Sequence, residues 1–403
     1  MYSVILKLAW NNAFLRLRRT LLVIIMIAVS MSMMLSIEGI YDGMVINMVD
    51  KTIRSDSGDI SIYNPKYRLN KLLQNSIKGA DEIKAALETR QDVESVVTRF
   101  SVEGLSSTAH KSSFSSIIGI DLDDEERFGA FSDFLKEGEI SFGKRGALIG
   151  SELAKTLKIR IGSKVVFTTQ DSSGDINAIA VRIRGIVQTT NIVLDATALY
   201  IDNKRLHTFL GVGEDEATQI AIRTKSETLQ QELQKRYKRL DVLSLMDLNP
   251  MLKMMEDMMV IFNSITFGIV MMVVFIGILG VMYVSILDRI REFGIMRGIG
   301  MPFRLIRLQI LLEALFVGLL GYLTGAVLGV AALLYLQYFG LDMSAWADGL
   351  ESFGYESIIY AHMQISYFTN TFLAIIAASL LSVLLPLRKI KTLNPIEVIK
   401  AET

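Results

Sequence analysis

The chain has 403 residues, 51% of them hydrophobic, and its mean hydropathy of +0.39 is high for a protein that lies wholly in water. Its 42 Lys and Arg residues balance 42 Asp and Glu residues, so the charge does not indicate nucleic-acid binding. Cysteine is absent, which excludes disulfides, cysteine-based metal sites and cysteine nucleophiles.

The hydrophobic residues gather in four long runs. These are Leu21–Ile37, Met258–Leu287, Leu308–Leu336 and Ile365–Leu387. A membrane-spanning helix needs about 20 apolar residues, with a range of about 17 to 25, so each run can cross a bilayer. The sequence therefore predicts an α-helical membrane protein with four transmembrane helices, arranged one plus three around a large α/β extracytoplasmic domain.

In chain order, segment 1–19 predicts a cytoplasmic amphipathic helix at the membrane surface. Trp10 suits the lipid interface, and the basic residues of the segment stay outside the hydrocarbon. Segment 20–42 follows as the first transmembrane helix. Its apolar spacing continues past the hydrophobic run, so we expect a stalk beyond the membrane. A signal peptide is the alternative interpretation, but no small-residue cleavage site follows the run.

The region 43–257 has the mixed α/β pattern of a globular extracytoplasmic domain. Alternating apolar residues predict strands at Asp59–Tyr63, Val93–Val102, Phe114–Ile120, Lys164–Thr169, Ile179–Val187, Ala198–Ile201 and Gln219–Arg223. Helical spacing predicts helices at Gly79–Thr89, Ser151–Leu157 and Ser226–Leu240.

The C-terminal part predicts three transmembrane helices and their connections. The helices are 258–287, 308–336 and 365–387. They are separated by a basic segment at 288–307 and a loop at 337–364, and a tail at 388–403 follows. Lys and Arg concentrate in 1–19, 288–307 and 388–403 and are absent from 337–364. The positive-inside rule therefore predicts a multi-pass membrane protein with both termini in the cytoplasm and 43–257 on the opposite side of the membrane.

The search for catalytic motifs returns little. The stretch 138–145 has the G-x4-G-K spacing of a phosphate-binding loop, but Arg145 stands where Ser or Thr would bind Mg²⁺. His110, His207 and His362 are scattered and lack the spacing of metal ligands. The sequence thus predicts no catalytic residue and no metal site, and a chain that is not an enzyme.

The predicted transmembrane helices carry two compositional features. Gly321, Gly325 and Gly329, with Gly318 just before them, form a ladder that lets another helix approach closely. Packing within the chain and a gliding interface are both open interpretations. Methionine, which adapts to many apolar shapes, is frequent in the first two helices. Candidates for contact with a lipophilic substrate, as an alternative to plain core packing, are Met26, Met33, Met34, Met255, Met258 and Met259.

Several segments resemble the permeases of the type VII ABC transporters, which have this one-plus-three topology. The resemblance is concentrated in REFGIMRGIGM (Arg291–Met301), LLEA (Leu311–Ala314) with the glycine ladder after it, and PLRKIKTLNPIEVIK (Pro386–Lys400). Further similar segments are KLAWNN (Lys7–Asn12), RRTLL (Arg18–Leu22) and, in the external region, ALIGSELAKTLKIRIGSKV (Ala147–Val165).

The resemblance implies that Glu292–Gly300 is a coupling helix that docks on a separate cytoplasmic ABC ATPase dimer. ATP and Mg²⁺ would bind to that partner, and this chain would bind no cofactor. Further implied partners are a second permease copy or a related permease, membrane lipid, and a periplasmic lipoprotein carrier or adaptor. The residues that the resemblance assigns to ATPase coupling are Arg291, Glu292, Gly294, Met296, Arg297 and Gly300.

Within the family, Gly185–Asp202 is similar to the lipoprotein-releasing permeases, a resemblance that implies a protein of the bacterial inner membrane with 43–257 in the periplasm. This implies mechanotransmission, in which cytoplasmic ATP hydrolysis drives a periplasmic movement that releases lipoproteins or other lipophilic cargo. The hairpin at Gln170–Asn177 is short and lacks the proline of the carrier-recruiting subunit, so docking of a carrier stays open. The alternatives are an efflux permease that works with an adaptor, and a scaffold that activates a cell-wall hydrolase.

Overall fold

The computed structural model describes residues 2–14, 17–189, 191–346, 349 and 357–391. Its contacts divide the chain into two compact units. We call the first, Met1–Val45 with Glu256–Met343 and Ile358–Thr403, the transmembrane unit. We call the second, Ile46–Met255 with Ser344–Ser357, the domain unit. Two predicted segments lie partly outside the described residues. They are the tail, from 392 onward, and the loop at 337–364, at 347–348 and 350–356.

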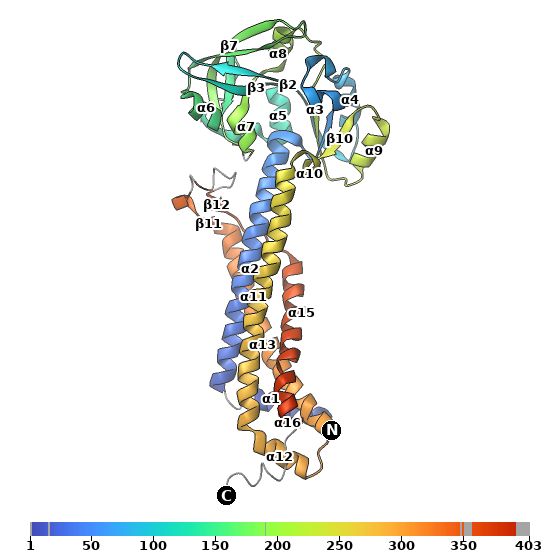
Figure 1. Cartoon of the computed structure of the whole chain (residues 1–403), viewed down its shortest axis with the longest axis vertical. Helices are drawn as coiled ribbons and strands as arrows, with labels where there is room; N and C mark the ends of the chain where they lie inside the picture. The colour runs from blue at the N-terminus through green and yellow to red at the C-terminus, as the bar shows by residue number, and fades with distance from the viewer. Residues whose placement is uncertain (1, 15–16, 190, 347–348, 350–356, 392–403) are drawn as a thin grey trace. The chain divides into compact units, whose positions relative to one another are not determined.

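Within the described residues, four helices are long and apolar enough to cross a membrane. The candidate spans are Leu17–Ser57, Leu252–Asp288, Phe303–Phe339 and Ile365–Arg388. One precedes the large α/β domain and three follow it (Figure 1). The predicted fold class is confirmed.

The helices of this part of the chain differ in length from the predicted transmembrane segments, since three of them extend further and the last, Ile365–Ser382, ends before 387. They are α1 (Tyr2–Phe14), α2 (Leu17–Thr52), α11 (Pro250–Asp288), α12 (Ile290–Gly298), α13 (Phe303–Phe339), α15 (Ile365–Ser382) and α16 (Leu384–Lys391). At 1.5 Å per residue, α2 and α11 are each roughly 55 Å long, whereas a hydrocarbon core is about 30 Å thick. Helix α13 begins at Phe303, directly after Pro302, so Arg304 and Arg307 belong to its first turns and not to a loop.

The domain unit is built on a ten-stranded sheet. Its strands are β1 (Ile60–Tyr63), β2 (Val93–Ser107), β3 (Ser112–Ile120), β4 (Leu135–Gly138), β5 (Gly146–Gly150), β6 (Lys164–Gln170), β7 (Ile176–Val187), β8 (Ala198–Asp202), β9 (Gln219–Thr224) and β10 (Asp241–Ser244). Strand β6 pairs with both β2 and β7, so β2, β3, β8, β5, β7 and β6 close into a barrel. Strands β9, β1 and β10 extend the sheet from β2, and apolar side chains such as Phe100 and Phe167 fill the barrel.

The domain also carries short helices that cover the sheet. They are α3 (Pro65–Asn70), α4 (Ala80–Glu88), α5 (Leu122–Gly129), α6 (Ser151–Leu157), α7 (Ile192–Thr197), α8 (Asn203–Leu210), α9 (Leu229–Arg236) and α10 (Leu245–Leu248). All seven predicted strands and all three predicted helices are present, within a few residues of their predicted ends. The additional helices have only four to eight residues, which is too short for a clear 3.6-residue periodicity.

Helix α13 packs against both α2 and α15 through its glycine ladder. A Cβ atom on Gly321 would lie 2.8 Å from Ile27 of α2, and one on Gly325 would lie 3.0 Å from Met31. Gly329 faces Leu35 of α2, whereas Gly318 faces Ser379 of α15. The ladder therefore lies at contacts between helices of the same chain, where a side chain would force the backbones apart.

We predict that Gly325→Leu separates α13 from α2, because the new side chain has no room beside Met31 and the Ala28 backbone. Overpacking of this kind costs about 1–3 kcal/mol, so thermal unfolding of the detergent-solubilised protein should begin at a lower temperature. Val327→Leu is the matched control, because Val327 is exposed on the same helix. Equal unfolding curves for the two variants would contradict the packing seen here.

Candidate functional site

The candidate site is the connection between α11 and α13, which contains the predicted coupling segment. Helix α11 ends at Asp288, the short helix α12 follows at once, and Gly300 and Pro302 separate α12 from α13. Gly300 has φ +94°, a left-handed conformation that favours glycine, and nothing lies near its Cβ position. A turn at Gly300 and a proline before α13 therefore limit α12 to nine residues, about two and a half helical turns.

A buried ion pair holds α12 to the transmembrane helices. Arg289 is 8% exposed and donates from Nη1 to the carboxylate of Glu313, which is 4% exposed on α13, over 3.1 Å. Its Nε donates to Glu292 of α12 over 3.0 Å, and its guanidinium lies over the ring of Phe293, 5.3 Å from the ring centre. The single side chain of Arg289 thus joins the end of α11 to α12 and α13.

Two further polar contacts extend this network. Ser285 of α11 donates to Glu313 over 3.4 Å, and Arg19 of α2 pairs with Asp288 over 2.6 Å. A cavity of about 260 Å³ lies between these residues and is lined by side chains from α1, α2, α11 and α13. The network connects the first turns of α2 to the segment that carries α12.

The predicted coupling residues divide between two faces of α12. Gly294 is buried beside Phe293, and Met296 and Arg297 are half-buried, so these residues belong to the inward face. Arg291 and Glu292 are exposed, as is Gly300 beyond the helix end. The predicted set therefore does not form a single surface.

Two apolar residues that the sequence analysis did not assign complete the outward face. Ile295 and Ile299 lie four residues apart, on the same side of the helix as Arg291 and Glu292, and Ile299 is 81% exposed. We call Arg291, Glu292, Ile295 and Ile299 the outer face of α12. It combines an apolar centre with charged neighbours, a composition typical of a protein contact.

Arg289 and Glu313 were also not assigned to the site from the sequence. A carboxylate inside an apolar run is the signal that could have indicated them, because an ionisable residue at that depth requires a partner. Glu313 is the only Asp, Glu, Lys or Arg between Leu308 and Leu336. The five arginines of the 288–307 segment gave no indication of which one pairs with it.

The candidate substrate-contact methionines lie in different environments. Met34 is buried in the helix core, and Met26 packs against Gly277 of α11. Met33 and Met258 are exposed, whereas Met255 and Met259 are half-buried. Their contact with a lipophilic substrate stays a prediction.

The residues weighed for catalysis have structural surroundings. His207 is buried against the ring of Phe100, with ring centres 5.0 Å apart. The 138–145 stretch runs from the end of β4 to the strand β5 and not into a helix. In the described part of the chain, no group of three or more His, Asp or Glu side chains is placed to hold a metal ion.

Comparison with known families gives two matches. Residues 20–240, more than half of the chain, match the MacB-like periplasmic core domain, and residues 264–395 match the FtsX-like permease C-terminal region. No curated protein sequence matches the chain.

Two solved structures are similar to the chain in part. The extracellular domain of the noncanonic ABC-type transporter YknZ from Gram-positive bacteria is 14% identical, covering 46% of this chain and 99% of that domain, with a TM-score of 0.32. The periplasmic region of MacB from Actinobacillus actinomycetemcomitans is 15% identical, covering 46% and 87%, with a TM-score of 0.33.

The two family matches lie end to end and follow the architecture described above. The periplasmic core model covers α2 and the barrel-containing domain, and the permease model covers most of α11 and continues through α12, α13 and α15. The chain belongs to the MacB- and FtsX-like permeases of ABC transporters, multi-pass membrane proteins with a large extracellular domain.

Proposed function

We propose that this permease subunit transmits the movement of a separate cytoplasmic ATPase to its own extracytoplasmic domain, and thereby releases lipoproteins or other lipophilic cargo from the inner membrane. ATP and Mg²⁺ would bind to the ATPase and not to this chain. The observation that carries the proposal is the two-sided character of α12. Its outer face exposes Ile295 and Ile299, while Arg289 contacts Glu292 and the buried Phe293 of α12 and binds Glu313 of α13.

The ion pair makes α12 suited to transmit movement. Two buried charges lose their hydration, and a partner and good geometry are needed to offset that loss. Arg289 meets this need only when the end of α11, α12 and α13 keep their present arrangement. A displacement of α12 by the ATPase would therefore move α11 and α13 with it, because a separated Arg289 and Glu313 would be left unpaired.

A second permease copy is supported by one face of α11. Six of its exposed apolar residues repeat at spacings of four and three, the pattern of a helix that packs on another helix. Each is more than half exposed: Met258, Phe262, Ile265, Ile269, Met272 and Ile276. The stripe lies within the predicted span 258–287, so in a single copy it would face lipid, whereas a second copy would cover it.

The lipophilic cargo is proposed from sequence and surface together. Gly185–Asp202 resembles the lipoprotein-releasing permeases, and the exposed Met258 and Met272 lie on the same stripe of α11. Methionine accommodates acyl chains of different shape because its side chain is flexible and polarisable. Two copies that face each other across this stripe would enclose an apolar surface.

We predict that changes to the outer face of α12 release the ATPase. Ile295→Asp and Ile299→Asp should each weaken copurification of the ATPase and the cargo release that it drives, because single residues at the centre of a contact contribute about 1–2 kcal/mol or more, which is a tenfold change or more in affinity. Membrane insertion should not change. ATPase partners and bound lipoproteins would be identified by mass spectrometry of the purified complex.

Glu256→Ala is the control for this experiment. Glu256 is an exposed carboxylate at the opposite end of α11, so its removal should leave the ATPase bound. If ATPase copurification and lipoprotein release stay normal in both α12 variants, α12 is not the coupling element. An ATPase that is bound without any lipoprotein would contradict the proposed cargo alone.

We predict that Glu313→Gln destabilises the transmembrane unit, because Arg289 would keep its charge without a buried counter-ion. Breaking one side of such a pair costs about 3–5 kcal/mol, whereas replacing both partners by apolar residues is often neutral. The double variant Arg289→Met/Glu313→Leu should therefore unfold near the wild-type temperature in detergent. A Glu313→Gln variant as stable as wild type would show that the pair does not hold α12.

We predict that Ile269→Cys forms a covalent dimer on oxidation in native membranes, because α11 would meet its copy along the stripe. The chain has no other cysteine, so any disulfide must join two introduced ones. Val274→Cys is the control, since Val274 is buried inside the transmembrane unit. Dimers would be detected by non-reducing electrophoresis, and their absence for Ile269→Cys would contradict a second identical copy at this face.

A further inference from the structure

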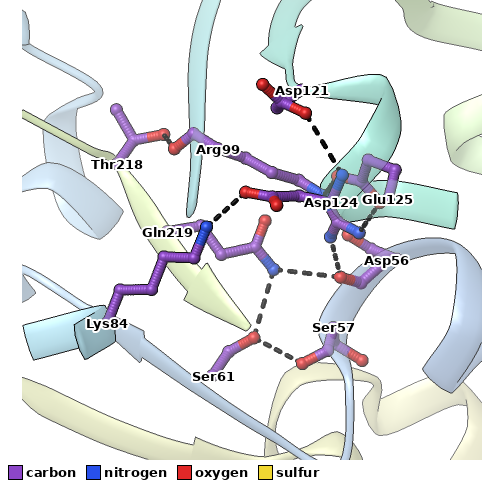
Figure 2. A network of polar contacts seen from close by, with 10 residues as sticks. All are labelled: Asp56, Ser57, Ser61, Lys84, Arg99, Asp121, Asp124, Glu125, Thr218 and Gln219. Carbon is purple, nitrogen blue, oxygen red and sulfur yellow. Dashed lines mark hydrogen bonds and ion pairs between the residues drawn. The ribbon is translucent and has the colours of Figure 1, made fainter. Parts of the chain in front are cut away.

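The end of α2 in the domain unit contains a feature that the proposed function does not use. Helix α2 ends at Thr52 and continues as a π-helical turn, Ile53–Ser57, before β1 begins. Isolated π turns are rare and occur mainly where a helix has a functional constraint. Side chains from β2, β9 and α5 gather around this turn, as Figure 2 shows.

Arg99 of β2 is the centre of this group. Its guanidinium binds the carboxylate of Glu125 on α5 through two hydrogen bonds of 2.5 and 2.7 Å. A third donor, Nη1, binds the backbone carbonyl of Asp56 in the π turn. The side chains of Arg99 and Glu125 are 4% and 2% exposed, so the contact is closed to water (Figure 2).

Other side chains bind the same turn. Gln219 of β9 donates to the Asp56 carbonyl over 3.3 Å and to Ser61 over 3.1 Å. Ser61 in turn donates to the carbonyl of Ser57 over 2.6 Å, and Asn191 donates to the Asp56 carboxylate over 3.2 Å. The last carbonyl groups of a helix have no partners within the helix. Here residues of the domain supply them.

A second contact joins the turn to α5. Arg54 donates from Nε to the carbonyl of Gly129 over 2.8 Å and pairs with Asp133. The backbones of the π turn and of α5 approach so closely that a Cβ atom on Gly129 would collide with the backbone of Arg54. Helix α5 is therefore held to the π turn at Gly129 and, through Glu125 and Arg99, at Asp56.

Stability alone does not account for a charge at this position. Burial opposes the charged form of Arg99, and the Glu125 carboxylate outweighs that effect and raises the pKa of Arg99. A pair of apolar residues of similar volume would fill the same space without the desolvation of two charges. What they could not do is bind a carboxylate and a backbone carbonyl at once, because this needs the fixed fork of donors of a guanidinium.

We propose that Arg99 is a positioning residue that locks the π turn at the end of α2 to the domain, so that α2 and the domain move as one body. The proposal rests on the proposed function in one respect, namely that α2 is displaced when the ATPase acts. Without the contacts of Arg99, the π turn Ile53–Ser57 would flex, and a displacement of α2 would not reach the domain. The contacts of Arg99 with the π turn and with Glu125 lie within this chain, so they can be tested without the ATPase.

The test compares distances between spin labels in the full-length protein in lipid nanodiscs. The chain has no native cysteine, so labels at Ile46→Cys on α2 and Lys225→Cys on the domain are the only ones. A second pair, Ser173→Cys and Lys225→Cys, reports on the domain alone. We expect one narrow distance distribution for each pair in the otherwise wild-type protein.

In Arg99→Met/Glu125→Leu, which replaces the ion pair by apolar residues, the α2–domain pair should lose its narrow distribution while the domain pair keeps its own. Lys84→Met/Asp124→Leu is the matched control. It removes an ion pair between α4 and the same helix α5, and neither residue has a hydrogen bond to the π turn. Both label pairs should stay narrow in this control.

A narrow α2–domain distribution in the folded Arg99→Met/Glu125→Leu protein would overturn the proposal. Broadening of the domain pair as well would also overturn it, because Arg99 would then only stabilise the domain. If the double variant does not fold, Arg99→Lys decides in its place. Lysine keeps the positive charge beside Glu125 but lacks the fork, so the α2–domain pair should still broaden, and a narrow distribution would overturn the proposal.

Discussion

The buried contact between Arg289 and Glu313 is the constraint on which the rest of the transmembrane unit depends. It joins the start of α12, directly after the end of α11, to the third turn of α13. A charged pair in an apolar environment is stabilising only with good geometry, so it tolerates little change in the positions of the helices. The glycine ladder has a related effect at a different place, because α2 can lie against α13 only where α13 has no side chains.

The same chemistry recurs at the far end of α2. There Arg99 binds a carboxylate and a backbone carbonyl, just as Arg289 binds the carboxylates of Glu292 and Glu313. In each case an arginine joins a helix end to elements that are distant in the sequence. Arginine suits this task better than lysine because its donors lie in one plane at fixed angles and it stays charged when buried. The proposed transmission of displacement requires such contacts at both ends of the long helices.

The candidate site shows where local patterns stop being informative. The segment Arg291–Met301 was predicted to be helical, and Glu292, which the resemblance assigns to ATPase coupling, is exposed. Which of its residues point outward depends on the rotation of α12 about its axis, and that rotation is set by the burial of Phe293 and Gly294 against the helix core. Ile295 and Ile299, the most exposed apolar residues of the segment, therefore became apparent only in three dimensions.

The domain shows the same division. Seven of its strands follow from alternation along the chain, but the closure of the barrel by β6, which pairs with β2 and β7 at once, does not. The pairing of β6 with β2 joins residues about 60 positions apart, and alternation within a strand says nothing about such a partner.

By itself, the sequence determined that the protein crosses the membrane, that one helix precedes the external domain and three follow it, and that the permease family applies. These properties depend on the length of apolar runs, on the placement of Lys and Arg, and on short motifs, all of which are local. Only the tertiary structure decided which charges meet. Arg289 finds Glu313 at a separation of 24 residues, and Arg99 finds Glu125 at 26 and the carbonyl of Asp56 at 43. Such partners are set by helix rotation and strand register, because a side chain can bind only what the packing of the whole chain brings within a few ångströms of it.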